Sequence, residues 1–343
     1  MKTSLRVVLC VVLLFGSLPL LAEEATFDRT LKVSGPVDLE VVTGSGSITV
    51  RNGAPGMIAV HGTVKAGFCF GFCGGSGDPA EAVKAIAANP PIEQSGSTVR
   101  VGHLGESQRY NNISISYELV VPAETKLLSK TGSGHQEISG IAGPAEVSAG
   151  SGSLRLSDIA GQVRARTGSG SITMSNLRGS VRAHAGSGSI KGEGVGISTL
   201  VENRAKYQGK DPSPAPATKA GSGFTDTSTM GSAADLDFQT GSGSIRVNDL
   251  RGTLRAHTGS GSIELQGQPT GDWSMTTGSG GITVRLPAQA AFNLDARTGS
   301  GSVRTDRQVV VQGTLDKHEL RGTVNGGGFH LDLHTGSGTI RIE

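Results

Sequence analysis

Apolar and polar residues alternate along most of this chain, and the tripeptide Gly-Ser-Gly interrupts the alternation at regular intervals. The tripeptide follows Thr or Ala eleven times, and three consecutive intervals between these copies are identical in length. Five and three residues before its first Gly, most copies carry an apolar or small residue, and the positions between are polar. Alternation with a period of two is typical of a half-buried strand. Each unit therefore predicts two short strands, for example over residues 163–167 and 172–174, joined by a Gly-Ser-Gly-Ser corner.

A fixed period near twenty residues indicates a stacked repeat protein. Two assemblies satisfy the pattern: a row of antiparallel hairpins, or a parallel coil in which equivalent strands stack. The coil is favoured because stacking would place each Ile on the next Ile and each Thr on the next Thr. We therefore expect an all-β fold, a parallel β-solenoid (β-helix) with turns of roughly 18 residues. We expect glycine at the corners because it takes positive φ without a steric penalty.

Two insertions interrupt the rhythm of the repeat. Residues 66–91 contain Asp78-Pro79-Ala80-Glu81, which predicts the start of a short helix that ends before Asn89. Residues 200–219 contain a proline-rich stretch that cannot pair as an interior strand. We predict a single β-solenoid domain over residues 23–343 with these two insertions, one of which contains the helix.

Residues 1–22 have the pattern of a secretory signal peptide. Lys2 and Arg6 precede an apolar run over residues 7–21, and the small residue Ala22 precedes two glutamates. Leu20 fits the cleavage rule poorly, so the sequence leaves the cleavage position open. The pattern predicts an exported protein, located in the periplasm or at the cell surface.

The charge balance of the mature chain argues against a nucleic-acid partner. Removal of residues 1–22 takes away two of the 31 basic residues and none of the 29 acidic ones, which leaves 29 of each. A net charge of zero gives no overall attraction to nucleic acid or to acidic membranes. No later stretch approaches the length of about 18 apolar residues that a membrane helix needs. We therefore expect no membrane span after signal cleavage.

Cys69 and Cys73 are the two cysteines of the mature chain. In an exported protein, an even pair suggests a disulfide that closes a small loop. Their spacing is one residue longer than that of the usual Cys-x-x-Cys sites, so metal binding, thiol exchange and free thiols remain alternatives. Phe68, Phe70 and Phe72 alternate around the pair. They would either pack on the stack or form an exposed apolar tip.

The glycine-rich corners match no known phosphate or calcium motif. They lack the third Gly of a dinucleotide fingerprint, and they carry Ser where calcium-binding β-rolls need Asp. No nucleophile is accompanied by its base. We therefore expect no catalytic residue, no metal site and no cofactor. The candidate acids for a hydrolase are scattered along the chain: Asp235, Asp237, Asp295 and Asp306.

The outward columns contain basic residues on consecutive units, namely Arg155, Arg164, Arg166, Arg182 and His184. If the strands stack in parallel, these residues form a basic stripe that could bind phosphates or the uronic acids of a glycan. The alternative is a solvated face that keeps a long sheet soluble.

Three segments carry a resemblance to a known family. Residues 114–123 (SISYELVVPA) lead into Leu127 and the Thr-Gly-Ser-Gly at 131–134, residues 282–288 (ITVRLPA) lead into the copy at 298–301, and Gly326-Gly327-Gly328-Phe329 precedes the copy at 335–338. This combination resembles the bacterial putative-adhesin family of unknown function, over most of residues 27–343. The resemblance implies a β-solenoid of the kind seen in autotransporter-adhesin-like head domains, and it brings no catalytic residues.

These observations favour a non-enzymatic exported protein of the cell envelope, a rigid β-solenoid scaffold or an adhesin-like binding module. Its partner would be an envelope protein or an acidic glycan, and the rods could associate end to end through exposed strands. One alternative is a polysaccharide-active β-helix enzyme, by analogy of fold alone. The other is an envelope-stress sensor module, which the resemblance permits.

Overall fold

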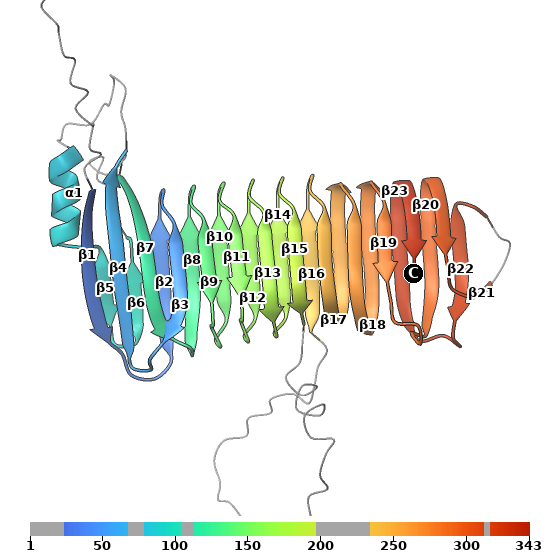
Figure 1. Ribbon diagram of the computed structural model, residues 1–343, viewed down its shortest axis with the longest axis horizontal. Coiled ribbons are helices and arrows are strands. Elements are labelled where there is room, and N and C mark those ends of the chain that lie inside the picture. The colour runs from blue at the N-terminus through green and yellow to red at the C-terminus, as the bar shows by residue number, and fades with distance from the viewer. Residues whose placement is uncertain (1–23, 68–78, 104–112, 197–233, 312–315) are drawn as a thin grey trace, which may run out of the picture.

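The computed structural model describes residues 24–67, 79–103, 113–196, 234–311 and 316–343, and these residues form an elongated stack of strands (Figure 1). The expected all-β class is confirmed, because the described residues contain strands and a single helix, α1 (Pro79–Ala88). The helix lies where the sequence of the first insertion predicts it. Within the described part of the chain, no helix is long and apolar enough to cross a membrane.

The central part of the stack contains twelve strands whose pairings are all parallel among themselves. Cα partners such as Leu127 and Ala145, or Ala145 and Val163, lie one repeat apart in the sequence, as the spacing of Gly-Ser-Gly predicts. The strands are β8 (Thr125–Thr131), β9 (Gln136–Ser139), β10 (Ala145–Ala149), β11 (Leu154–Ser157), β12 (Val163–Thr167), β13 (Ile172–Leu177), β14 (Val181–Ala185), β15 (Ile190–Val195), β16 (Asp235–Thr240), β17 (Ile245–Ser260), β18 (Ile263–Ser279) and β19 (Ile282–Arg285).

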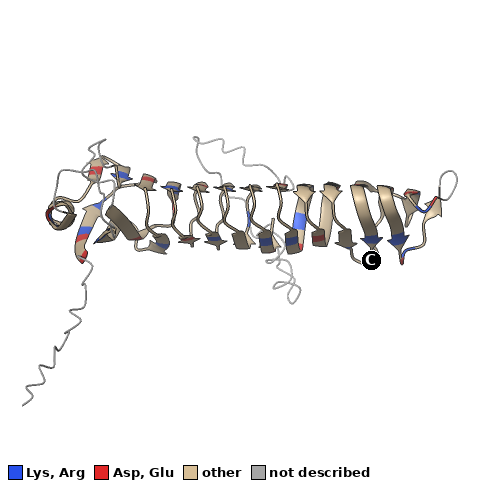
Figure 2. Cartoon of the chain, turned by 90° about the horizontal axis from the view of Figure 1, so that it is seen from above, with Lys and Arg blue, Asp and Glu red and all other residues tan. Residues whose placement is uncertain are grey.

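The strands lie in two rows that face each other across the core (Figure 2). Face 1 is made by the strands that lead into the Gly-Ser-Gly corners, and face 2 by the strands that follow these corners. In the centre, face 1 consists of β8, β10, β12, β14, β16 and the second parts of β17 and β18. Face 2 consists of β9, β11, β13, β15, the first parts of β17 and β18, and β19.

Alternate residues of both faces point into the core, as the period of two predicts. Val163 and Ala165 on face 1, and Ile172 and Met174 on face 2, are at most 1% exposed. The largest fully buried side chain, Trp273, also satisfies its polar atom, because Nε1–H donates to Gly252 O at 2.9 Å.

Close contact between successive turns explains the glycines of the corners. A Cβ on the first or second Gly of most described copies would overlap the carbonyl oxygen of the equivalent Gly in the neighbouring turn, as Gly168 shows against Gly150 and Gly170 against Gly152. Neither Gly168 nor Gly170 has positive φ. The expectation that positive φ requires these glycines is therefore wrong at most corners, since backbone stacking leaves no room for a side chain.

The Thr before Gly-Ser-Gly turns inward and connects successive turns. Thr240 donates its hydroxyl to Gly188 O at 2.8 Å and accepts a hydrogen bond from Gly243 N at 3.1 Å. Equivalent donations run from Thr167 to Gly152, Thr258 to Gly243, Thr277 to Gly261, Thr335 to Gly280 and Thr298 to Gly338, with distances of 2.8 to 3.0 Å. The buried hydroxyl thus satisfies corner carbonyls that would otherwise lack a partner.

The second corner of the central turns uses a left-handed residue followed by a buried apolar one. Asp158, Asn176 and Asp249 have φ of 55°, 53° and 50°. The residues after them, Ile159, Leu177 and Leu250, are fully buried. Asp and Asn tolerate this conformation better than other residues with a side chain, so they can turn the chain and direct the next side chain into the core.

At the N-terminal end, the order of strands in space departs from their order in sequence. The chain forms β1 (Glu24–Lys32), then a first turn made of β2 (Val37–Thr43) and β3 (Ile48–Gly53), then β4 (Met57–Ala66), α1, β5 (Ile92–Ser95), β6 (Thr98–Val101) and β7 (Ile113–Pro122). On one side β2 and β3 pair with β8 and β9, and on the other with β6 and β7. The outermost pairings, β1–β4–β7 and β5–β6, are antiparallel. Helix α1 packs on β1 and β4 and buries Val83 and Ile86.

The C-terminal end has the same kind of rearrangement. The strands are β20 (Phe292–Thr305), β21 (Val310–Val311), β22 (Glu319–Val324) and β23 (Phe329–Ile342). The last strand, β23, lies between β18 and β19 on one side and β20 on the other. The outermost pairings, β20–β22 and β21–β22, are antiparallel. The parallel stack is therefore closed by antiparallel pairs at both ends.

Candidate functional site

Face 1 brings four of the five predicted basic residues together. Arg164 on β12 lies opposite Arg182 on β14, and Arg166 lies opposite His184, in an unbroken parallel register. All four residues are exposed. They line a groove of about 320 Å³, together with residues of β16 that include Asp237. We call this the basic groove.

The three arginines of the basic groove carry no ion pair with any residue that the structure describes. Asp237 lies beside them on the next strand, where it accepts hydrogen bonds from Gln239 Nε2 at 3.0 and 3.3 Å. The arginines near the C-terminal end differ, because Arg297 and Arg321 are held by Asp295 and Glu319 with N–O distances of 2.5 to 3.5 Å. The basic groove thus presents guanidinium groups whose hydrogen-bond donors remain open to a ligand.

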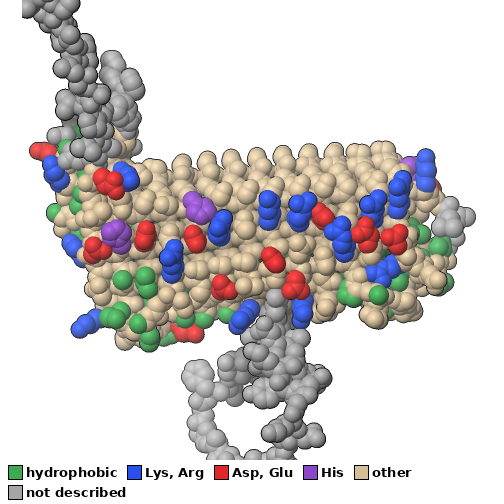
Figure 3. Space-filling view, in the orientation of Figure 1, with side chains coloured by type: hydrophobic (Ala, Val, Ile, Leu, Met, Phe, Trp, Pro, Cys, Tyr) green, Lys and Arg blue, Asp and Glu red, His purple; other side chains and the backbone are tan. Residues whose placement is uncertain are grey.

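Arg155 does not belong to this group, and the expectation that it lies with the other four is wrong. It is on β11 of face 2, opposite Glu137 and Thr173. Arg155 follows its Gly-Ser-Gly corner, whereas the other four residues precede theirs, so the core separates it from them. On face 2, side chains of both signs run along the stack. Over the centre of the stack, the upper long edge in Figure 3 shows no charged side chain.

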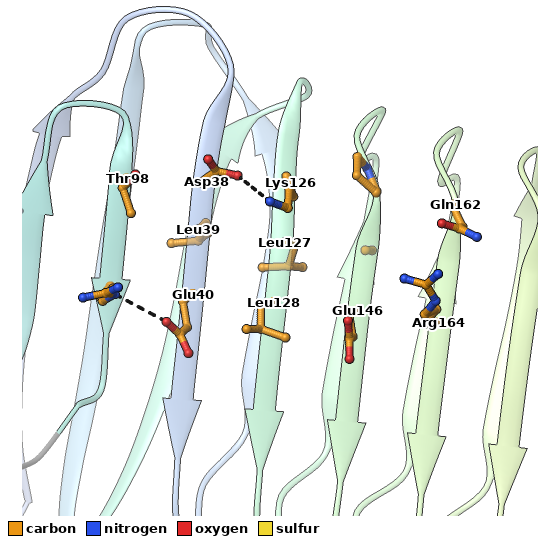
Figure 4. Close-up of a pocket in the computed structure, with 13 residues that line it drawn as sticks. Asp38, Leu39, Glu40, Thr98, Lys126, Leu127, Leu128, Glu146, Gln162 and Arg164 are labelled. Carbon is orange, nitrogen blue, oxygen red and sulfur yellow. Dashed lines mark ion pairs between the residues drawn. The ribbon is translucent and has the colours of Figure 1, made fainter.

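A second groove of about 280 Å³ adjoins the first at Arg164 and extends across β10, β8, β2 and β6 (Figure 4). We call it the amphipathic groove, because Leu128 and Pro144 lie among charged neighbours on its surface. Lys126 Nζ is 3.2 Å from Asp38 Oδ1. Arg100 Nε and His103 Nε2 are each 3.5 Å from Glu40 Oε2. These pairs fix the charges at one end of the groove, and Arg164 lies at the other end.

Sequence reasoning missed the amphipathic groove, although one signal was available. Leu128 is the only apolar residue among the described members of its outward column, which otherwise holds charged residues and Ser274. Single apolar residues on a surface are common, so this signal alone does not predict a groove. Strand β6 completes the groove because the chain returns to the outer side of β2 after α1.

The four candidate acids of a hydrolase do not converge. Asp235 and Asp237 lie on β16, Asp306 follows β20, and Asp295 is bound by two arginines. The structure places Asp295 opposite Asp332 of β23, a pair of neighbouring carboxylates that the sequence order hides. Neither of these two residues lines the two grooves described above.

Several sequence predictions lie outside the described residues. Cys69, Cys73 and the three neighbouring phenylalanines belong to this group, as do the signal peptide at 1–22 and the insertion at 200–219. The disulfide therefore stays a prediction. Within the ranges that the structure describes, no group of three or more His, Cys, Asp or Glu residues could hold a metal ion.

The described residues define an elongated all-β repeat protein with an open basic groove on one flat face. Residues 218–343, a little over a third of the chain, match the model of the family described as Toastrack DUF4097. A search of curated proteins finds no match.

Two solved structures resemble the chain at low identity. One is described as a "putative cell adhesion protein" from Clostridium sporogenes; it is 11% identical, covers 93% of this chain and 99% of its own, and has a TM-score of 0.20. The other, described as a "putative adhesin" from Bacteroides fragilis, is 10% identical, covers 93% and 97%, and has a TM-score of 0.25. At these TM-scores neither structure bears on the fold or function of this chain.

Proposed function

We propose that this chain is a non-enzymatic scaffold or binding module of the cell envelope, built as a single β-solenoid domain over residues 23–343 whose turns match the Gly-Ser-Gly repeat. The observation that carries the proposal is the basic groove, where Arg164, Arg166 and Arg182 stand side by side on rigid strands without ion-pair partners among the described residues. Such a surface suits the binding of an anionic partner rather than a chemical reaction.

The parallel register supports this proposal energetically. Strand pairing fixes the backbone of each arginine, so ligand binding orders only side chains and loses little conformational entropy. A guanidinium group binds a carboxylate or phosphate through two parallel hydrogen bonds. The adjoining amphipathic groove, with Leu128 and Pro144 on its surface, adds an apolar contact beside these charges. An acidic glycan or an acidic envelope protein combines both kinds of surface.

Kinship with the adhesin-like family is part of the proposal. The match of residues 218–343 to the Toastrack model supports it for the C-terminal part of the chain. The resemblance carried by residues 114–134 extends it toward the N-terminus.

Export and end-to-end association are further parts of the same proposal. Residues 1–22 would direct export, and the amino terminus of the protein recovered from fractionated cells should then start near Glu23. The stack presents edge strands at its two ends: β1 and β5 at one, and β21 at the other. Their unpaired backbone groups would support end-to-end contacts between rods.

The experiment that tests the binding function compares two triple variants of matched charge. Arg164→Gln/Arg166→Gln/Arg182→Gln removes the basic groove, and Arg51→Gln/Arg155→Gln/Arg178→Gln removes three exposed arginines elsewhere on the stack. Both are tested for capture of acidic glycans and of crosslinked envelope proteins from the native cell. We expect the first variant to lose at least tenfold in affinity and the second to bind normally. Equal binding by both variants, or turnover of a polysaccharide by the purified protein, would overturn the proposal.

A further inference from the structure

One outward column of face 1 contains no carboxylate over nine consecutive strands. It lies two residues before the first Gly of each copy, at the side of face 1 next to the uncharged Gly-Ser-Gly edge. We call it the acid-free column. In the order of the stack from β8 to β20, its members are Lys130, Ser148, Arg166, His184, Gln239, His257, Thr276, His334 and Arg297.

The histidines of the acid-free column occur on alternate strands. His184, His257 and His334 are separated by Gln239 and Thr276. Adjacent strands are about 4.8 Å apart, so the histidines recur about every 10 Å along the stack. This regular spacing is not apparent in the sequence. His334 belongs to the last repeat of the chain, but its strand, β23, lies beside β18 in the structure.

The surroundings of His184 contain more cationic than anionic groups, whereas those of His257 contain one of each. His184 lies between Arg166 and Gln239 in the column and shares its strand with Arg182, and the nearest carboxylate is that of Asp237 on the next strand. His257 lies between Gln239 and Thr276 and shares its strand with Arg255; Asp237 is again the diagonal neighbour.

His334 has two carboxylates nearby and one arginine beside it. It lies between Thr276 and Arg297, and Asp332 precedes it on its own strand. The diagonal carboxylate of Asp295 is occupied by Arg297, with an N–O distance of 2.6 Å. Arg297 is also 3.4 Å from Glu319, which lies opposite it on β22, so its charge is compensated. Protonation of the three imidazoles would therefore extend a positive track from Arg166 to His334.

We infer that the acid-free column binds an extended acidic polysaccharide that lies along the stack and carries one carboxylate per two sugar residues, and that protonation of the histidines tightens this binding. The inference rests on the proposed binding function and names its ligand and its regulation. Ser148, Gln239 and Thr276 provide neutral donors and acceptors for sugar hydroxyls between the cationic positions. In a polysaccharide with one carboxylate per disaccharide, the distance between successive carboxylates is about the distance between histidines on every second strand.

The composition of face 1 favours a glycan over a nucleic acid. Among the described outward residues of face 1 there is no Phe, Tyr or Trp on which bases could stack. The permanent positive charges of the acid-free column are also sparse, whereas a nucleic-acid strand carries a phosphate on every nucleotide. Histidine changes its charge between about pH 5 and pH 8, where uronate groups, like other carboxylates, stay ionised.

The test measures binding of the full chain to immobilised hyaluronan, which carries one carboxylate per disaccharide, at pH 7.5 and pH 5.5 and constant ionic strength. We expect the affinity to rise about tenfold at the lower pH, since each exposed charge pair contributes modestly. His184→Gln/His257→Gln/His334→Gln should bind as the original chain does at pH 7.5 and lose the increase. The matched control is His61→Gln/His135→Gln/His330→Gln, which leaves the acid-free column intact and should keep the increase.

The possible results separate this inference from the proposed function. Binding that needs the arginines of the basic groove but does not respond to pH, or responds equally in the histidine variant, overturns the inference and leaves the binding function standing. Equal binding of single-stranded DNA or polyphosphate overturns the assignment to a glycan. Failure to bind hyaluronan at either pH also overturns the inference. The proposed function falls on different results: an arginine variant that retains every captured partner, or turnover of a polysaccharide by the purified protein.

Discussion

The central stack and its two ends both place each strand of a turn between neighbouring strands, but the chain follows different paths in the two regions. From β8 to β18, each turn lies beside the turn that precedes it among the described residues, and every pairing is parallel. At the ends, the first turn (β2 and β3) and the last strand (β23) lie inside the stack, covered by segments from further along or further back in the chain. In the centre, each repeat provides a pairing surface for the next one. At each end of this molecule, segments that do not follow the repeat cover the outermost turn.

The physical reason is the edge of the sheet. The last turn of a stack in simple sequence order would have a neighbour on one side only and would present unpaired N–H and C=O groups. Here residues 37–53 and 329–342 have neighbours on both sides, and the outermost positions are taken by antiparallel pairs and by α1. Chain termini ordinarily open first, so the position of β23 between β18 and β20 should suppress unravelling from the C-terminal end.

The largest predicted effect follows from removing β23. Deletion of residues 329–343 removes Leu331, Leu333, Ile340 and Ile342, four fully buried side chains worth about 2 kcal/mol each, and leaves β20 without its parallel partner. We expect amide hydrogens of β20 and β22 to exchange freely while those of β10 to β15 stay protected. Deletion of residues 24–32 is the control, since β1 pairs only with β4. Unchanged protection of β20 after removal of β23 would contradict the inserted position of that strand.

A pair of engineered disulfides tests the order of strands directly, in a chain with Cys69→Ser and Cys73→Ser. Ser274 and Asp332 are Cα partners on adjacent strands, and adjacent strands are close enough for a disulfide. Ser274→Cys/Asp332→Cys should therefore oxidise readily. Ser274→Cys/Asp295→Cys joins positions that simple sequence order would make neighbours, but β23 separates them. Crosslinking of the second pair instead of the first would show that the last strand is not inserted.

The second effect compares one motif position in the centre and at the end. A Cβ at Gly168 would overlap Gly150 O, whereas the equivalent Gly44 in the first turn has nothing within 4 Å. We expect Gly168→Ala to cost about 3 kcal/mol through overpacking and Gly44→Ala to stay within about 1 kcal/mol of the original. Thermal unfolding measures both. Equal costs at the two positions would indicate that conformational preference, rather than the contact between turns, selects these glycines.

The third effect concerns the inward threonines. Thr240 makes two hydrogen bonds at 2.8 and 3.1 Å to neighbouring backbone groups, and Thr43 at the end makes one at 2.8 Å to Ile115 O, with a longer contact to Ser45 O. Substitution by Val keeps the shape and leaves these buried groups without partners, at about 1 kcal/mol for each lost bond. Thr240→Val should therefore lower the free energy of unfolding about twice as much as Thr43→Val. An equal loss at both sites would mean that the second bond of Thr240 contributes nothing.

The smallest effect is electrostatic and links the centre to the inserted C-terminus. Hydrogen bonds from Arg285 and then Arg246 lower the pKa of Glu264, and Arg285 also binds Glu343 at 2.9 Å. A lowered pKa in the folded state stabilises the protein above the usual Glu value of about 4.3 and is lost as the pH falls through the folded pKa. Glu264→Gln should cost under about 1 kcal/mol at pH 7, and this cost should shrink as the pH falls below the usual Glu value and through the lowered pKa. Glu137→Gln serves as the control, because Glu137 lies on the same face and has no ion pair within the described part of the chain. A cost that persists in acid would have another cause.

The sequence predicts the central turns well because each contact there repeats. The Gly-Ser-Gly spacing and the period of two correctly predicted which residues of β8 to β18 turn inward and which turn outward, and the Asp-Pro-Ala-Glu segment predicted α1. The sequence-based explanation for the glycines was wrong at most corners. It considered the φ preference of a single residue, whereas the overlap with Gly150 or Gly152 is a contact between two neighbouring turns. The prediction that Arg155 lies beside Arg164 was also wrong. A corner of the chain separates these two residues, so they belong to opposite faces.

The sequence by itself determined the all-β class and the alternation of buried and exposed residues, because these depend on local periodicity. It favoured parallel stacking in the centre but left a row of antiparallel hairpins open. Only the tertiary structure decided that β2, β3 and β23 lie inside the stack, that Asp295 meets Asp332, and that three histidines recur on alternate strands. Equivalent repeats have nearly the same inward residues, so the sequence of one strand is compatible with several different neighbouring strands. The choice among them depends on the capping of the two ends, which involves contacts between segments far apart in the chain.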